Sequence, residues 1–173
     1  MSRPSWDQHF IGIAREVAKM GTCARRQVGC VLVDKKNFML STGMNGMPPG
    51  WDHCRDNPGH ECPGADAKSG ADLDLCYANH AEINALIHCP DVSRIHAVYT
   101  TVNPCISCIK ALLCTGARRI VFEEVYPHQE SRKLWVARPC MVKEPDGMYT
   151  YHRTWEHFSN GMTNLIDSSS FKC

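Results

Sequence analysis

The sequence predicts an α/β fold, a three-layer α/β/α sandwich around a mixed sheet of about five strands. Segments with apolar residues at helical spacing alternate with short apolar runs rich in β-branched residues. This order is typical of parallel strand pairs that are connected by helices packed on both faces of a sheet. The length of 173 residues suits one domain with a single core, so we expect residues 1–173 to form one unit.

The chain is predicted to begin with a helix and a hairpin. Ser5 is a suitable N-cap because Gln8 follows three residues later, as in a capping box. Apolar residues then recur at helical spacing as far as about Gly21. Two short strands at 28–34 and 38–41 follow, separated by a predicted turn at 35–37.

Helices and strands alternate in the rest of the chain. We expect helices at 79–88 and 105–115, and buried strands at 97–102 and 119–122. Further on, a helix at 131–136 and a short strand at 141–143 are predicted. The Ser-rich C-terminal residues 167–173 are expected to form a flexible tail.

Four residues with metal or acid–base chemistry stand at the starts of the two central helices. His80 and Glu82 begin the first, and Cys105 and Cys108 begin the second, directly after a proline. One imidazole and two thiolates leave a tetrahedral zinc ion one position for water, as in catalytic sites. We therefore predict a catalytic zinc on His80, Cys105 and Cys108, with Glu82 as the proton carrier. A zinc that only stabilises the fold is the alternative, but it leaves Glu82 without a role.

The pattern H-x-E…P-C-x-x-C is the signature of zinc-dependent base deaminases. Together with the G-x-N-G-x-P motif at 43–48 and the strand before it, this pattern makes residues 5–126 resemble the deoxycytidylate deaminases, within the cytidine and deoxycytidylate deaminase superfamily. The resemblance implies a cytidine-deaminase-like sandwich that hydrolyses dCMP to dUMP and ammonia, with dCTP left open as a second substrate. Glu82 would move a proton from the attacking water to N3 of cytosine and a proton to the leaving amine.

The substrate contacts are carried over from the family by motif. Asn45 matches the asparagine that holds the substrate sugar, and Tyr126 matches a tyrosine that contacts the phosphate. Their alternatives are a left-handed turn residue and a side chain that fills a gap. Arg25, and with less support Arg26, precedes the first strand, where a guanidinium suits a phosphate. A solvated basic pair is the other interpretation of the two arginines.

The segment 48–77 is a Cys- and His-rich insertion, too long for a simple connection. Some bacterial and phage deoxycytidylate deaminases hold a second, structural zinc with cysteines at similar positions. The resemblance therefore implies a second zinc on Cys23, Cys54, Cys62 and Cys76, with His60 or His53 as a substitute ligand. Free thiols are the alternative.

Relatives in this family are commonly hexamers that are activated by dCTP and inhibited by dTTP with magnesium. The resemblance therefore implies an allosteric homohexamer with dCTP and dTTP as effectors, Mg²⁺ beside the effector and an effector site in a loop next to Asn45. The formal net charge of +1 argues against a long nucleic acid as partner.

No apolar run is long enough to span a membrane and no secretory leader is visible. We expect a cytoplasmic enzyme of pyrimidine deoxynucleotide metabolism, in its own organism or in a phage-infected host cell. Two other functions remain open: deamination of another base, such as tRNA adenosine or guanine, and a catalytically silent, zinc-stabilised nucleotide-binding module.

Overall fold

The computed structural model describes residues 3–56, 62–64, 75–125, 129–137, 141–143, 149–151 and 153–166. The helices are α1 (Trp6–Ala18), α2 (Ala81–Ile87), α3 (Ile106–Leu113) and α4 (Gln129–Val136), with a short 3-10 helix at Val92–Arg94. The strands are β1 (Gly29–Asp34), β2 (Met39–Met44), β3 (Ile95–Val102), β4 (Arg119–Glu124), β5 (Met141–Lys143), β6 (Tyr149–Tyr151), β7 (Thr154–Ser159) and β8 (Met162–Leu165). None of the helices in these ranges is long and apolar enough to cross a membrane.

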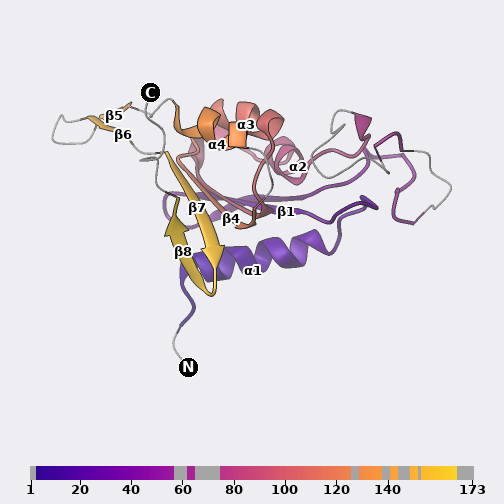
Figure 1. The fold of residues 1–173 in the computed structure, drawn as a ribbon, viewed down its shortest axis with the longest axis horizontal. Coiled ribbons are helices and arrows are strands. Elements are labelled where there is room, and N and C mark those ends of the chain that lie inside the picture. Colours follow the sequence, from indigo (N-terminus) through magenta and orange to yellow (C-terminus); the bar gives the residue numbers. More distant parts are fainter. Residues whose placement is uncertain are drawn as a thin grey trace.

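A six-stranded mixed sheet forms the middle layer, in the order β2-β1-β3-β4-β7-β8. Strand β1 is antiparallel to both β2 and β3, whereas β3, β4 and β7 run parallel, and β8 returns antiparallel to β7. Helix α1 covers one face, and α2, α3 and α4 cover the other (Figure 1). The predicted three-layer α/β/α sandwich is confirmed, with one strand more than the expected five.

Two apolar clusters fill the spaces between the layers. One includes Leu32, Ile109 and Trp135 on the side of α2, α3 and α4, and the other includes Phe10 and Val33 on the side of α1. All six residues of β1 are buried, because successive side chains of this strand point alternately into the two clusters. This buried strand therefore contacts helices of both layers, α1 and α2.

Most predicted elements are present, with shifted ends. Ser5 caps α1 as predicted: its hydroxyl accepts a hydrogen bond from the Gln8 backbone N–H at 3.2 Å, and the Gln8 side chain accepts one from the Ser5 N–H at 2.7 Å. The helices expected at 79–88 and 105–115 begin later, because the residues before Ala81 and Ile106 are N-caps. Strand β2 runs beyond the expected end at 41 to Met44, since its pairing with β1 continues that far.

The C-terminal strands differ most from the prediction. The strand expected at 141–143 exists as β5, but it pairs with β6 in a separate two-stranded sheet. The main sheet is completed by β7 and β8, neither of which was predicted. Strand β7 carries Glu156 and His157 between its buried aromatic residues, and these polar side chains obscure the apolar pattern. The predicted tail 167–173 lies outside the described residues.

A largely buried ionic network joins α1 to the strands. Arg119 of β4 donates hydrogen bonds to both carboxylate oxygens of Asp7, at 2.7 and 2.8 Å, and also to Glu156 of β7. The hydroxyls of Tyr99 and Thr163 donate to Asp7 at 2.8 and 2.6 Å. Burial alone would raise the pKa of Asp7, but the hydrogen bonds from Arg119, Thr163 and Tyr99 together hold that pKa below its usual value of 3.8. Asp7 and Arg119 together therefore link α1 to β3, β4, β7 and β8.

Candidate functional site

Three potential metal ligands meet where the chain enters α2 and α3. His80 is the N-cap residue of α2, Cys105 is the N-cap residue of α3, and Cys108 lies in the first turn of α3. The Nδ1 atom of His80 lies 3.3 Å from each of the two sulfurs, which are 3.6 Å apart. Within the described part of the chain, no other set of three or more His, Cys, Asp or Glu residues has all its donor atoms within 4.8 Å of one another.

The spacing of these donor atoms fits a zinc ion. Tetrahedral bonds of about 2.3 Å to sulfur and about 2.0–2.1 Å to nitrogen imply separations of about 3.8 Å between sulfurs and about 3.6 Å between sulfur and nitrogen. Hydrogen bonds from Cys108 and then from His80 lower the pKa of the Cys105 thiol to about 4, so this sulfur is a thiolate at neutral pH. The same contact with Cys105, with burial, raises the pKa of the Cys108 thiol. The ligands predicted from the sequence therefore lie together in an arrangement that can hold zinc.

Glu82 stands beside this group on the first turn of α2. Its side chain is almost fully buried, and its Oε2 atom lies 3.5 Å from the Cys108 sulfur. Burial raises the pKa of the Glu82 carboxyl, because a charged carboxylate loses its hydration there. A carboxyl group beside a metal centre, with a pKa moved toward neutrality, has the properties of a proton carrier.

The G-x-N-G-x-P motif lies next to the metal ligands. Gly46 and Asn79 exchange two backbone hydrogen bonds of 3.1 and 2.9 Å, so the motif is paired with the residue that precedes His80. The side chain of Asn45 is buried, donates to the carbonyl of Arg26 at 2.6 Å and accepts from the N–H of Val28 at 2.8 Å. Asn45 does not have the left-handed backbone conformation of the alternative interpretation.

The other predicted substrate contacts are only partly visible. Arg25 is half-buried, and Arg26 forms an ion pair with Glu124, with Nη1 and Oε2 3.5 Å apart. This pair brings the segment before β1 to the C-terminal end of β4. Tyr126 lies outside the described residues, so its predicted phosphate contact stays a prediction.

The four cysteines of the predicted second zinc site lie in a chain of contacts. The sulfurs of Cys62 and Cys76 are 3.8 Å apart, Cys76 also contacts Cys23, and Cys54 contacts Cys62. The mutual three-donor spacing of the His80 site is not repeated among these described cysteines. Of the substitute ligands, His53 instead faces Asp56, with Nδ1 and Oδ2 3.2 Å apart. His60 lies outside the described residues.

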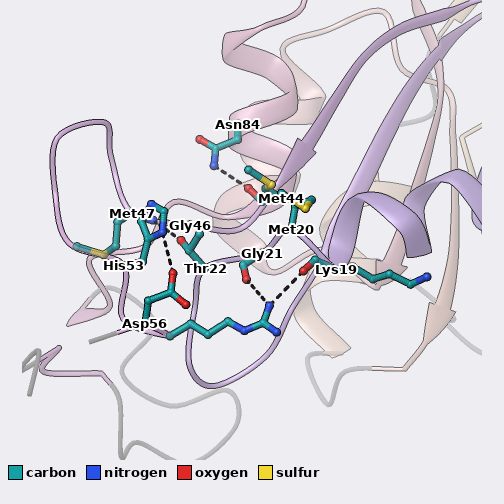
Figure 2. A pocket seen from close by; sticks show the side chains of 11 residues that line it. Lys19, Met20, Gly21, Thr22, Met44, Gly46, Met47, His53, Asp56 and Asn84 are labelled. Carbon is teal, nitrogen blue, oxygen red and sulfur yellow. Dashed lines mark hydrogen bonds and ion pairs between the residues drawn. The ribbon is translucent and has the colours of Figure 1, made fainter. Parts of the chain in front are cut away.

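A pocket of about 390 Å³ opens between the end of α1, the end of β2 and α2 (Figure 2). Its wall includes Asn84 of α2, whose side chain donates to the Met44 carbonyl at 2.7 Å. Arg55 also lines it and donates to the carbonyl of Lys19 at 3.1 Å. The sequence analysis expected an effector site beside Asn45 but named none of these side chains. They come from separate segments that only the fold brings together, so no local motif could have identified them.

Comparison with known proteins places these features in a family. The chain is 40% identical over 127 residues to the deoxycytidylate deaminase of Mycobacterium phage D29, covering 70% of this chain and 97% of that protein. It is 36% identical over 126 residues to the deoxycytidylate deaminase of Schizosaccharomyces pombe, covering 72% of this chain but only 38% of the yeast protein. The phage relative is thus matched over nearly its whole length, whereas the yeast relative is much longer than the shared part.

The fold is also similar to solved structures. The dCMP deaminase of cyanophage S-TIM5, solved in complex with dCMP and dUMP, matches with a TM-score of 0.59 at 22% identity, over 78% of this chain and 92% of that one. This similarity confirms the predicted cytidine-deaminase-like fold. The model of the cytidine and deoxycytidylate deaminase zinc-binding region matches residues 4–124, which include the whole His80, Glu82, Cys105 and Cys108 group. With most of its length matched by that model, the chain belongs to the cytidine and deoxycytidylate deaminase family.

Proposed function

We propose that the chain catalyses the hydrolytic deamination of dCMP to dUMP and ammonia. The observation that carries this proposal is the buried Glu82 carboxyl, 3.5 Å from a sulfur of the His80, Cys105 and Cys108 group. The activity named for the D29 relative, which is matched over 97% of its length, supports the choice of a deoxycytidylate substrate. Residues 1–173 would form one deaminase domain of a cytoplasmic enzyme, in its own organism or in an infected host cell.

His80, Cys105 and Cys108 would hold the catalytic zinc. When bound, zinc lowers the pKa of a coordinated water and so makes a nucleophile available at neutral pH. Glu82 accepts the proton of the attacking water and delivers it to N3 of the cytosine, while the new C–O bond forms at C4. Glu82 then takes the proton of the new C4 hydroxyl group and carries it to the amino group, which leaves as ammonia when the C4–N bond breaks and the C4 carbonyl forms. Burial of Glu82 keeps this exchange away from bulk water.

Three residues are proposed to hold the nucleotide. Asn45 uses one N–H and one oxygen lone pair on the backbone of residues 26–28, which leaves its amide with one further N–H and one lone pair for the deoxyribose hydroxyl. Tyr126 and Arg25 are the proposed phosphate contacts. The same backbone bonds fix the orientation of the Asn45 amide before substrate arrives.

The proposal is tested by ammonia release from dCMP, with dCTP, CMP and deoxycytidine assayed in parallel. Rapid turnover of dCMP supports it, and the dCTP trace decides whether the triphosphate is also a substrate. If none of these four compounds releases ammonia, tRNA and guanine are assayed next, and ammonia release from either would replace dCMP as the substrate. Binding of dCMP without any ammonia release would identify a nucleotide-binding module instead.

We further propose a second, structural zinc on Cys23, Cys54, Cys62 and Cys76. Their sulfurs form a chain of contacts from Cys23 to Cys76, Cys62 and Cys54, and those of Cys62 and Cys76 are 3.8 Å apart. Backbone N–H groups also donate to three of these sulfurs: those of Arg25 and Arg26 to Cys23, of Gly64 and Tyr77 to Cys62, and of Ala78 to Cys76. Amides that converge on sulfurs stabilise thiolates, and four thiolates form a closed structural zinc site.

Metal analysis of the purified protein should give two zinc ions per chain. Cys76→Ser should reduce this number to one and lower the melting temperature, because zinc in such a site stabilises the fold directly. Cys114→Ser, a change at an exposed thiol outside both clusters, is the control and should keep both ions. One zinc per fully active wild-type chain would exclude the second site.

The 390 Å³ pocket is proposed as the site of a deoxynucleotide effector, dCTP or dTTP with Mg²⁺, in a homohexamer. Lys19, Arg55 and His53 offer donors for phosphate groups, and Met20, Met44 and Met47 offer an apolar surface for a base. The pocket touches the catalytic elements through Asn84 and through Gly46, which pairs with Asn79. An effector bound here would therefore act directly on α2.

Arg55→Ala should weaken the response of dCMP turnover to dCTP, with at least a tenfold higher dCTP concentration needed for half of the effect. The guanidinium would no longer be available to a triphosphate, which prefers such donors. Arg94→Ala, at a surface arginine paired with Asp34, is the matched control. An unchanged dCTP response in Arg55→Ala would place the effector elsewhere, and light scattering on both variants gives the oligomeric state.

A further inference from the structure

We infer that Gly43, the first residue of the G-x-N-G motif, is a positioning residue that sets the place of Glu82. This inference rests on the proposed function, because it concerns the carboxyl that moves the proton. The motif residue with an expected role in substrate binding is Asn45, whereas Gly43 has no side chain that could bind the substrate or a metal ion. Its effect comes from the side chain that it lacks.

A β-carbon at position 43 would collide with the first turn of α2. It would lie 2.2 Å from the Ala81 carbonyl oxygen and 2.3 Å from the Ala85 nitrogen, distances that real β-carbons do not show. These two atoms are the acceptor and donor of the second i to i+4 hydrogen bond of α2, directly after the bond from the Asn84 N–H to the His80 carbonyl. The helix backbone thus rests directly on the backbone of β2, with no side chain between them.

Two side-chain hydrogen bonds hold the helix in this close position. Ser41 of β2 donates to the Ala85 carbonyl at 2.7 Å, and Asn84 of α2 donates to the Met44 carbonyl at 2.7 Å. They lie on either side of Gly43 along the strand. The contact between α2 and β2 therefore has a defined depth and register.

The depth of this contact determines where Glu82 lies relative to the metal ligands. Glu82 follows Ala81 directly, and the two cysteine ligands are carried by a different helix, α3. Strand β2 is paired with β1 at five positions, so an added methyl group at residue 43 would displace the start of α2 rather than the strand. That displacement would move Glu82, together with His80 at the same helix start, relative to Cys105 and Cys108.

The size of the effect follows from the geometry that proton transfer requires. Misplacing a catalytic group by about 1 Å can cost about 100-fold in rate. Gly43→Ala should therefore lower kcat for dCMP by about 100-fold, with KM changed less than threefold. The kcat is expressed per bound zinc, because His80 belongs to the same helix start as Glu82. Amide hydrogen exchange should show faster exchange in α2 but not in α3.

Gly116→Ala is the matched control. A β-carbon there would lie 2.0 Å from the Ser93 carbonyl oxygen, an equally severe overlap with backbone, but in the turn between α3 and β4. Gly116→Ala should lose thermal stability yet keep the wild-type kcat below its melting temperature. If Gly43→Ala also keeps the wild-type kcat while folded, or loses activity only in proportion to unfolded protein, the inference is overturned.

Asn84→Ala and Ser41→Ala provide a test without overlap, in case Gly43→Ala does not fold. Each removes one of the two ties of α2 to β2, and each should lower kcat three- to tenfold. Wild-type kcat in both variants would overturn the inference. Wild-type protein that does not release ammonia from dCMP would instead refute the proposed function, and the hydrogen-exchange comparison of Gly43→Ala with Gly116→Ala would still report on the position of α2.

Discussion

Replacing Glu82 by glutamine is expected to lower kcat for dCMP by about 10²- to 10⁴-fold, the range that general acid–base catalysis contributes. Glutamine has nearly the same shape but cannot accept the proton of the attacking water or pass one to N3. The variant should keep its zinc, because Glu82 is not one of the three closely spaced ligands. Steady-state ammonia release and metal analysis on the same preparation check both statements.

The melting temperature of Glu82→Gln distinguishes a lost proton carrier from damage to the fold. Glu82 is 4% exposed, so a neutral amide avoids the cost of burying a carboxylate, and the variant should melt no lower than wild type. Glu130→Gln, at an exposed glutamate of α4 that pairs with Lys133, is the control and should retain full activity. Substantial turnover by Glu82→Gln would assign the proton transfers to another group.

Arg119→Met is expected to produce the largest loss of stability, about 3–5 kcal/mol, the usual cost of removing one partner from a buried ion pair. Asp7 and Glu156 would remain in place with side chains only 17% and 11% exposed and without their cation. For a chain of this size the loss corresponds to a fall in melting temperature of about 6–20 °C. Calorimetry at neutral pH measures it.

The difference between wild type and Arg119→Met should depend on pH. In wild type the pKa of Asp7 is held below 3.8, so this group stabilises the fold above that pH and loses its contribution as pH falls through the lowered pKa. Without Arg119, burial raises the Asp7 pKa and the variant lacks this stabilisation near neutrality. The difference in stability between wild type and Arg119→Met should therefore become smaller below about pH 4. Arg118→Met, at the neighbouring half-buried arginine, should differ little from wild type at any pH.

The four candidate site residues could be located from the sequence because their spacing is local. His80 and Glu82 are two residues apart on one helix start, and Cys105 and Cys108 are three apart on another, so each pair is placed by its own helix. The contact between the pairs needs only that β2 and β3 end on the same side of the sheet. The alternation of helices and strands predicted parallel strand pairs, whereas the grouping of the four residues was inferred from the H-x-E…P-C-x-x-C pattern.

What the sequence analysis missed depends on contacts distant in sequence. Strand β7 was missed because Glu156 is buried only through its pairing with Arg119, 37 residues earlier. The pocket was missed because Lys19, Met44, Arg55 and Asn84 belong to separate segments. The close contact at Gly43 could not be predicted from the sequence either, since its partner atoms belong to the backbone of Ala81 and Ala85, about 40 residues away.

The metal ligands also occupy positions that usually serve helix stability. His80 and Cys105 are the N-cap residues of α2 and α3, and neither side chain caps its helix. A Ser, Thr, Asp or Asn at each position would contribute about 1 kcal/mol by bonding a free amide of the first turn. With zinc on His80 and Cys105, as we propose, the ion would give both helix starts the order that a capping side chain would supply. Chelation should loosen the two ends together, so that loss of zinc removes the nucleophile and also releases the turn that holds Glu82.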